Sequence, residues 1–271
     1  NKAPIKNGSP TILANTNVKI YVAPIEANYT YSIGDATNNK TAYDMFEQWS
    51  QIGGLYAWLY DTNFSHYLYP YNSFSAMPES IKYMHEKGVE LAYIEGQHNL
   101  RTQARTGFND FKKYVNGQFL IDFNQNYSDL KYKYFKNYYG SGYAKMNTFF
   151  DEMVARLETF ETDTTLKNIL YSGSAKSIYS HIDDARLWDK DQLLRWATLC
   201  SEAYANETDA TIKNIRGVLE SPSALKTAVF AAYLLEKLGY TSRDHCKQCL
   251  CSIHIDENPG DRQASCMGIL E

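Results

Sequence analysis

A run of apolar and aromatic residues from Leu55 to Tyr60 does most to restrict the folds open to this chain. The run follows the glycine pair Gly53 and Gly54, which ends the preceding helical pattern, and it carries no charge before Asp61. An uninterrupted apolar run between turn residues is typical of a strand buried on both faces, as parallel sheets require. The sequence therefore predicts an α/β fold with a parallel sheet.

Two further strand patterns flank this run along the chain. Residues 18–25 are β-branched and aromatic and precede Glu26, and residues 89–95 form a third short strand pattern. Helical patterns at 41–50 and 78–87 separate the three strands, which we place near 18–25, 55–61 and 89–95. We expect Thr41 to cap the first helix, Pro78 to start the second and Gly88 to stop it. Strand–helix alternation of this kind predicts parallel strands with right-handed crossovers.

Three parallel strands form a poor sheet on their own, because both edges stay open. Parallel barrels have eight strands. We therefore expect residues 1–125, which end with a helix from 108 to 122, to be the C-terminal three strand–helix units of a (β/α)8 TIM-like barrel. The missing N-terminal barrel half is then expected in the full-length protein. A small doubly wound sheet is the competing interpretation, but the chain lacks the GxGxxG and Walker motifs that nucleotide binding would require.

The second half of the chain shows helical periodicity without a convincing strand. Helical patterns at 129–138, 143–160, 191–205, 210–219 and 222–238 predict an α-helical bundle domain over residues 126–240. Residues 241–271 form a cysteine-rich tail of uncertain structure. Its cluster of Cys246, Cys249, Cys251, His254 and Cys266 matches two-armed zinc spacing only in part. Metal binding, free thiols and a terminal segment foreign to the fold stay open as interpretations, and we predict no cofactor.

Charge and hydropathy argue against several classes of partner. The net charge is −4 and no Lys/Arg-rich run occurs, which disfavours nucleic acid. No segment reaches the ~18 apolar residues that a membrane span needs. No GxSxG elbow is present, and Cys200 is the first cysteine, so a Ser or Cys nucleophile is not supported. Residues 1–9 lack the shape of a signal peptide and an initiating methionine, which suggests a fragment or a processed chain.

The chain contains 23 tyrosines, which cluster in residues 56–71 and 127–143. Rings with a polar edge suit sugar faces, because C–H groups pack on the ring while the hydroxyl bonds outward. The alternative is that tyrosines simply fill half-buried positions. The clusters suggest a carbohydrate surface without requiring one.

A carboxylate stands at the end of each predicted strand: Glu26, Asp61 and Glu95. Adjacent strands lie ~4.8 Å apart, so side chains at neighbouring carboxyl ends can converge on one site. Glycoside hydrolysis needs two carboxylates, one to protonate the leaving oxygen and one to act as base or nucleophile. The alternative for each acid is that it merely starts a loop. We predict Glu95 as the first catalytic candidate, then Glu26 and Asp61. The predicted substrate-binding residues are Trp58, Tyr60, Asn63, His66 and Arg101.

Several segments of roughly residues 15–235 resemble a bacterial family, domain-of-unknown-function family 4838. They are Val22–Ala27, Trp58–Phe64 followed by Pro70 and Tyr71, Tyr93–Gly96, and Phe135–Gly140. One departure is Leu59, where many relatives carry an acidic residue; the acid here is Asp61.

Members of that family contain barrels and are related in appearance to the α-glucuronidases of glycoside hydrolase family 67. The resemblance implies a carbohydrate-active, glycoside hydrolase-like protein that is extracellular or on the cell surface. The implied partner is a poly- or oligosaccharide, one that can contain uronic acid. A non-catalytic carbohydrate-binding or cell-surface protein on the same scaffold is the alternative.

Overall fold

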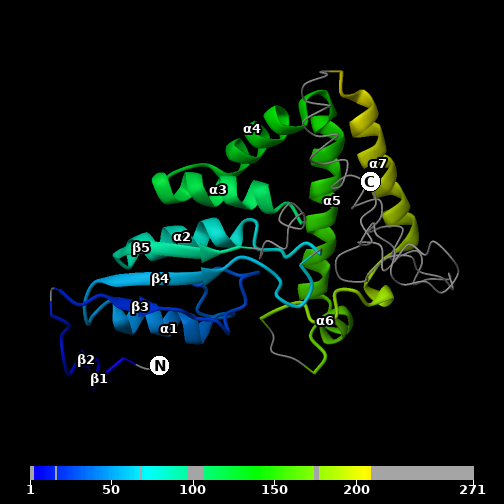
Figure 1. Ribbon diagram of the computed structural model, residues 1–271. Coiled ribbons are helices and arrows are strands. Elements are labelled where there is room, and N and C mark those ends of the chain that lie inside the picture. Colours follow the sequence, from blue (N-terminus) through cyan, green and yellow to red (C-terminus); the bar gives the residue numbers. More distant parts are fainter. Residues whose placement is uncertain (1–2, 16, 68, 97–106, 174–176, 209–271) are drawn as a thin grey trace, which may run out of the picture.

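The computed structural model describes residues 3–15, 17–67, 69–96, 107–173 and 177–208. Its centre is a three-stranded sheet of β3 (Ile20–Val22), β4 (Leu55–Tyr60) and β5 (Val89–Glu95). The strands are parallel and stand in the order β3-β4-β5, with β4 in the middle (Figure 1). They lie within the ranges expected from the sequence. A small antiparallel pair, β1 (Ile5–Lys6) and β2 (Ser9–Pro10), precedes them.

The two faces of β4 differ in burial. Leu55, Ala57 and Leu59 are fully buried on one face, whereas Tyr56, Trp58 and Tyr60 alternate with them and stay partly exposed. The expectation of a strand buried on both faces is therefore wrong for the described residues. Right-handed crossovers place consecutive helices on the same side of a sheet, so α1 and α2 cover one face and leave the aromatic face open.

Helix α1 (Lys40–Trp49) follows β3 and helix α2 (Ala76–Glu86) follows β4. Phe46 of α1 and Met84 of α2 join the apolar core beneath the sheet. The N-cap of α1 is Asn39 and not Thr41, and its side chain makes no capping bond. Its Nδ2 donates instead to the carbonyls of Asn28 at 2.8 Å and Ser32 at 3.0 Å. Asn39 thereby fixes the loop that carries the chain from β3 to α1.

The end of α2 follows the sequence pattern more closely than its start. Pro78 is the third residue of the helix, not the first. Gly88 follows the helix in the left-handed region, with φ +72°. Glycine adopts that conformation without the steric penalty that a Cβ brings, so Gly88 turns the chain into β5.

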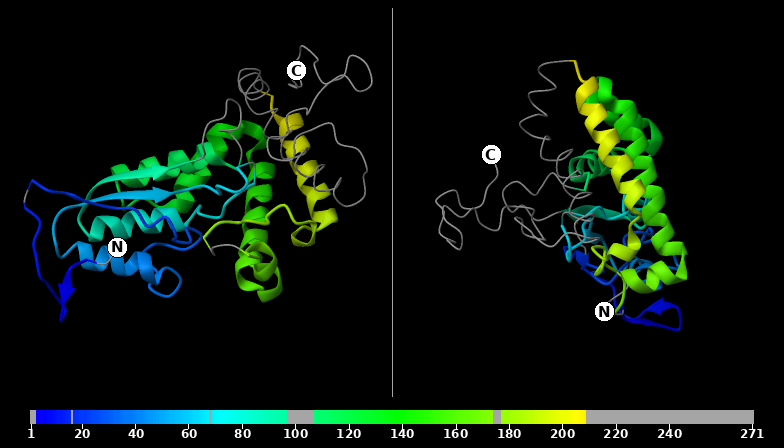
Figure 2. Two further views of the ribbon diagram at one scale, coloured as in Figure 1. Left: turned by 60° about the horizontal axis from the view of Figure 1, so that its bottom comes forward. Right: turned by 90° about the vertical axis from the view of Figure 1, so that its right-hand side faces the viewer.

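The remaining elements are helical. They are α3 (Asn109–Ile121), α4 (Tyr127–Tyr139), η2 (Gly140–Gly142), α5 (Tyr143–Thr162), α6 (Thr164–Leu170), η3 (Ala185–Leu187) and α7 (Lys190–Asn206). Helices α5 and α7 run side by side in opposite directions (Figures 1 and 2). Helix α6, which the sequence patterns did not indicate, is capped at its N-terminus by Asp163, whose side chain accepts from the Leu166 amide. The helices expected at 210–219 and 222–238 lie outside the described residues.

The apolar core is continuous from the sheet to the helices of the second half. The Phe74 ring lies 4.8 Å from the Phe150 ring, and the Phe108 ring lies 6.0 Å from that of Phe135. These contacts cross the boundary expected near residue 125. Within the described part of the chain, none of the helices has the length and apolar character needed to cross a bilayer.

Candidate functional site

Glu95 lies at the carboxyl end of β5, paired in register with Tyr60 of β4. Trp58 donates from its indole Nε1 to Glu95 Oε2 at 2.8 Å. Glu95 is partly exposed, and this is the one hydrogen bond that its side chain makes to another described residue. The strand pairing therefore brings together three of the residues predicted for the site: Glu95, Trp58 and Tyr60.

Five aromatic side chains share the open side of the sheet, and we refer to them as the aromatic sheet face. Register pairs Tyr21 with Tyr56, and Trp58 with Tyr93, so these side chains and Tyr60 stand on one side. The ring of Trp58 lies 4.7 Å from that of Tyr93 and 6.0 Å from that of Tyr21. Tyr21 is 50% exposed and Tyr93 is 49% exposed. Solvent thus reaches a stripe of rings that ends at Glu95.

The loop after β4 continues this stripe beyond the sheet. The Phe64 ring lies 5.8 Å from that of Tyr60 and 6.3 Å from that of Tyr67. Partial burial raises the pKa of both Tyr60 and Tyr67, and the negative charge of Glu95 raises the pKa of each further. Both phenols accordingly stay protonated near neutral pH.

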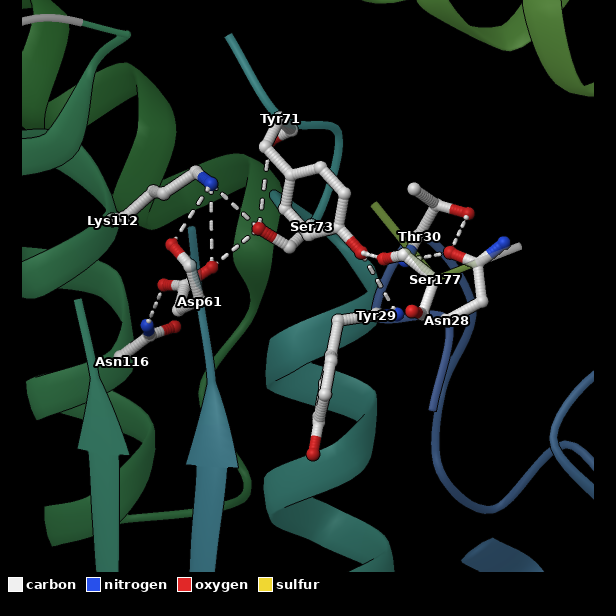
Figure 3. Close-up of polar contacts among 9 residues, drawn as sticks. All are labelled: Asn28, Tyr29, Thr30, Asp61, Tyr71, Ser73, Lys112, Asn116 and Ser177. Carbon is white, nitrogen blue, oxygen red and sulfur yellow. Dashed lines mark hydrogen bonds and ion pairs between the residues drawn. The ribbon is translucent and has the colours of Figure 1, made fainter. Parts of the chain in front are cut away.

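Asp61 follows β4 directly, but its side chain is buried in the interior of the protein. Its carboxylate is 4% exposed and accepts a hydrogen bond from Ser73 and one from Asn116 Nδ2 at 2.7 Å. Lys112 Nζ lies 3.3 Å from Oδ1 of Asp61 and donates to Ser73 Oγ at 2.6 Å (Figure 3). Both carboxylate oxygens therefore have partners within the fold.

Lys112 is as deeply buried as its partner, with a side chain 6% exposed. Burial lowers the pKa of its ammonium, and the charge of Asp61 opposes that effect. The ammonium also lies over the Phe74 ring at 4.9 Å and the Tyr71 ring at 5.4 Å. The pair joins the end of β4 to α3 and leaves little of Asp61 for a substrate.

A second polar network joins the loop after β3 to a distant segment. The Tyr71 hydroxyl accepts from the Tyr29 amide at 3.1 Å and donates to the Ser177 carbonyl at 2.8 Å. Next to it, Thr30 Oγ1 donates to Asn28 Oδ1 at 2.8 Å (Figure 3). Tyr71 thus holds the β3–α1 loop near the carboxyl edge of the sheet.

The other predicted site residues are spread around this edge. Glu26 is exposed and makes no hydrogen bond or ion pair to a described residue. Asn63 is 1% exposed and donates from Nδ2 to the Tyr179 carbonyl at 3.1 Å. His66 Nε2 lies 3.1 Å from the Ser180 carbonyl and 3.8 Å from Asp183 Oδ1. Arg101 lies outside the described residues.

Sequence reasoning missed the partners of Asp61: Ser73, Lys112 and Asn116. A signal for two of them was present, because Lys112 and Asn116 stand four residues apart, each directly after an apolar residue of α3, Phe111 and Val115. Polar residues at i and i+4 beside an apolar stripe can face the same buried partner. No comparable signal marks Ser73, which reaches Asp61 only through the loop between β4 and α2.

Metal chemistry has no candidate centre in the described ranges. No group of three or more His, Cys, Asp or Glu side chains lies close enough there to hold an ion. The cluster of Cys246, Cys249, Cys251, His254 and Cys266 lies outside those ranges.

Comparison with protein-family models places this geometry in context. The model for a domain of unknown function, DUF4838, matches residues 5–151. The chain belongs to this family. The DUF4838 match confirms the resemblance seen in the sequence, and it spans all three parallel strands, Glu95 and Lys112.

A second family model, described as the RNHCP domain, matches residues 231–271 and includes the cysteines of the tail. The tail thus matches a different family from the DUF4838 portion. No curated protein and no solved structure matches the chain.

Proposed function

We propose that this chain is a carbohydrate-active, glycoside hydrolase-like protein that binds a poly- or oligosaccharide along the aromatic sheet face. The observation that carries the proposal is the position of Glu95, a partly exposed carboxylate at the carboxyl edge of a parallel sheet, held by the Trp58 indole at the end of a row of rings. Carboxyl edges of parallel strands are where α/β folds place their ligands.

The chemistry follows from the groups at this edge. Ring faces such as those of Trp58 and Tyr93 pack against the C–H groups of a pyranose, and the phenol of Tyr60 offers a hydroxyl to its oxygens. Glu95 is the carboxylate that acts on the glycosidic oxygen. Glycoside hydrolysis needs a second carboxylate. Glu26, exposed after β3, is the candidate within this chain, and further strands of a barrel in the full-length protein are the other source.

A non-catalytic sugar-binding role is the second candidate, and the state of Asp61 favours it. Of the three carboxylates at the strand ends, Asp61 is buried with both oxygens occupied. A chain that kept the aromatic surface and only one well-placed acid would bind saccharide without cleaving it. An extracellular or cell-surface location suits both roles.

The test compares hydrolysis of aryl glycosides and aryl glucuronides by the full chain and by Glu95→Gln. General acid or base catalysis contributes about 10²–10⁴-fold, so we expect kcat to fall by at least ~100-fold in the variant. Saccharide binding, followed by titration, should change far less than kcat because the rings remain.

Glu90→Gln is the matched control. Glu90 lies at the opposite end of the same strand, where it pairs with Lys19 at 2.5 Å. This variant should keep wild-type activity. Hydrolysis that survives Glu95→Gln intact would rule out Glu95 as the catalytic acid, and saccharide binding without any hydrolysis would support the second role.

A further inference from the structure

A small polar pocket lies behind the carboxyl end of β4. It has about 10 Å³ of room for the centre of a water molecule, and its lining includes Asp61, Asn63, Tyr67, Tyr71 and Lys112. Space of this size accommodates about one water or one hydroxyl group. The pocket is too small for a sugar ring and large enough for one polar substituent.

The hydrogen bonds described around the pocket leave the side-chain oxygen of Asn63 without a partner. The charges of Asp61 and Lys112 satisfy each other, and Asn63 Nδ2 donates to the Tyr179 carbonyl. Asn63 Oδ1 is buried and accepts no hydrogen bond in the described structure. A buried carbonyl oxygen without a donor is unfavourable and is normally satisfied by a water or a ligand. The unfilled requirement is therefore for a hydrogen-bond donor.

The pocket adjoins the site at Glu95. The Asp61 amide donates to the Glu95 carbonyl at 2.7 Å, so the pocket starts one residue beyond the strand pair that carries the carboxylate. Tyr67 lines the pocket, and its ring also lies beside Phe64 at the end of the aromatic stripe. A group entering this pocket can thus belong to a sugar that lies against the rings.

We propose that this pocket is a subsite for a single hydroxyl donor, the hydroxymethyl group of a neutral hexose bound on the aromatic sheet face. A hydroxyl can donate to Asn63 Oδ1 as it fills the space, whereas a carboxylate accepts only and offers that oxygen no proton. Lys112 gives a carboxylate no compensation, because its charge is already paired with Asp61. This inference rests on the proposed carbohydrate function and adds a preference for neutral hexoses over uronates.

The experiment measures dissociation constants of the full chain for methyl glucoside, methyl xyloside and methyl glucuronide, in both anomeric series, by NMR titration. Xylose lacks the hydroxymethyl group, and glucuronate carries a carboxylate in its place. One hydrogen bond of ordinary strength corresponds to about three- to tenfold in affinity. We expect glucoside to bind about three- to tenfold more tightly than xyloside, and glucuronide to bind no better than xyloside.

Asn63→Ala should bring the ratio of glucoside to xyloside affinity to about one. A change in the stability of the variant would affect both affinities alike and would leave this ratio unchanged. Ser65→Ala, two residues further along the chain and outside the pocket lining, should leave the ratio unchanged. Equal affinity of the wild type for glucoside and xyloside, or tightest binding of glucuronide, would overturn the subsite while leaving the proposed function standing. Absence of binding to all three glycosides would overturn both.

Discussion

At the scale of single residues, Asp61 and Lys112 form the most deeply buried ion pair in the described structure, with side chains 4% and 6% exposed. Removing one member of a buried pair strands the charge of the other, which costs about 3–5 kcal/mol. We therefore expect Lys112→Met to lower the free energy of unfolding by about that amount, and Asp61→Asn to do the same. Urea denaturation of the full chain measures both.

Two further variants make this prediction specific. Lys113→Met removes the neighbouring lysine, whose side chain is 57% exposed and 3.6 Å from Asp110, and should change stability by less than ~0.5 kcal/mol. The double variant Asp61→Asn with Lys112→Met should lose much less than the sum of the two single losses, because neither charge is then left alone. Equal effects of the Lys112 and Lys113 substitutions would contradict the burial of the pair.

Cys200 provides a chemical probe of burial at the residue scale. It is 1% exposed in α7, and burial raises the pKa of its thiol from 9.0 to about 12. The thiolate is the species that alkylates, so at pH 8 its fraction falls about a thousandfold below that of a free thiol. We expect the Cys200 peptide to stay unlabelled by iodoacetamide in the native protein and to react in denaturant. Peptide mapping by mass spectrometry separates this cysteine from the four of the tail, and rapid native labelling would argue against the packing of α7.

At the scale of elements, two glycines predict opposite effects of the same substitution. Gly88 ends α2 at φ +72°, where an alanine Cβ is strained although space is free. Gly117 lies inside α3, also with free space around it and with ordinary helical geometry. We expect Gly88→Ala to destabilise the protein by about 1–2 kcal/mol and Gly117→Ala to stabilise it by about 0.5–1 kcal/mol. Thermal melts of the two variants, side by side, check the sign, and stabilisation by both would contradict the left-handed conformation of Gly88.

The helices and strands show which parts of this fold can be predicted from local sequence patterns. Apolar runs and glycine stops located β4, β5 and the end of α2 within a few residues, because those signals act over short distances. Which face of β4 is buried and which is open was not predictable in the same way, since it depends on the side on which the crossovers place α1 and α2. The barrel was inferred from the number of strands, and it stays a prediction, because the described sheet has three strands and does not close.

The residues of the candidate site fall into the same two groups, those that local patterns predict and those that depend on distant contacts. Glu95, Trp58 and Tyr60 were found because strand ends and strand register follow from local pattern. The role of Asp61 was missed, because Lys112 is 51 residues away from it in the sequence. The same holds for Asn63, whose partner Tyr179 is 116 residues away. Contacts between residues so far apart in the sequence depend on tertiary packing, which local patterns of residues do not reveal.

At the scale of the whole molecule, the question is whether residues on the two sides of position 125 unfold together. The core passes from the sheet through Phe74 to Phe150, and Phe149 lies 5.6 Å from Trp196 of α7. A shared core of this kind predicts one cooperative transition, because neither part can expose its apolar surface without the other.

The four tryptophans allow this to be tested. Trp49 and Trp58 lie on the sheet side, Trp188 and Trp196 lie on the helical side, and residues 209–271 contain none. In Trp188→Phe with Trp196→Phe, fluorescence reports the sheet side; in Trp49→Phe with Trp58→Phe, it reports the helical side. We expect the fluorescence midpoint in urea to equal the far-ultraviolet circular dichroism midpoint within each double variant, although the variants will differ from each other in stability. Fluorescence midpoints that depart from the circular dichroism midpoint in opposite directions in the two variants would instead show two independently folding units that meet near residue 125.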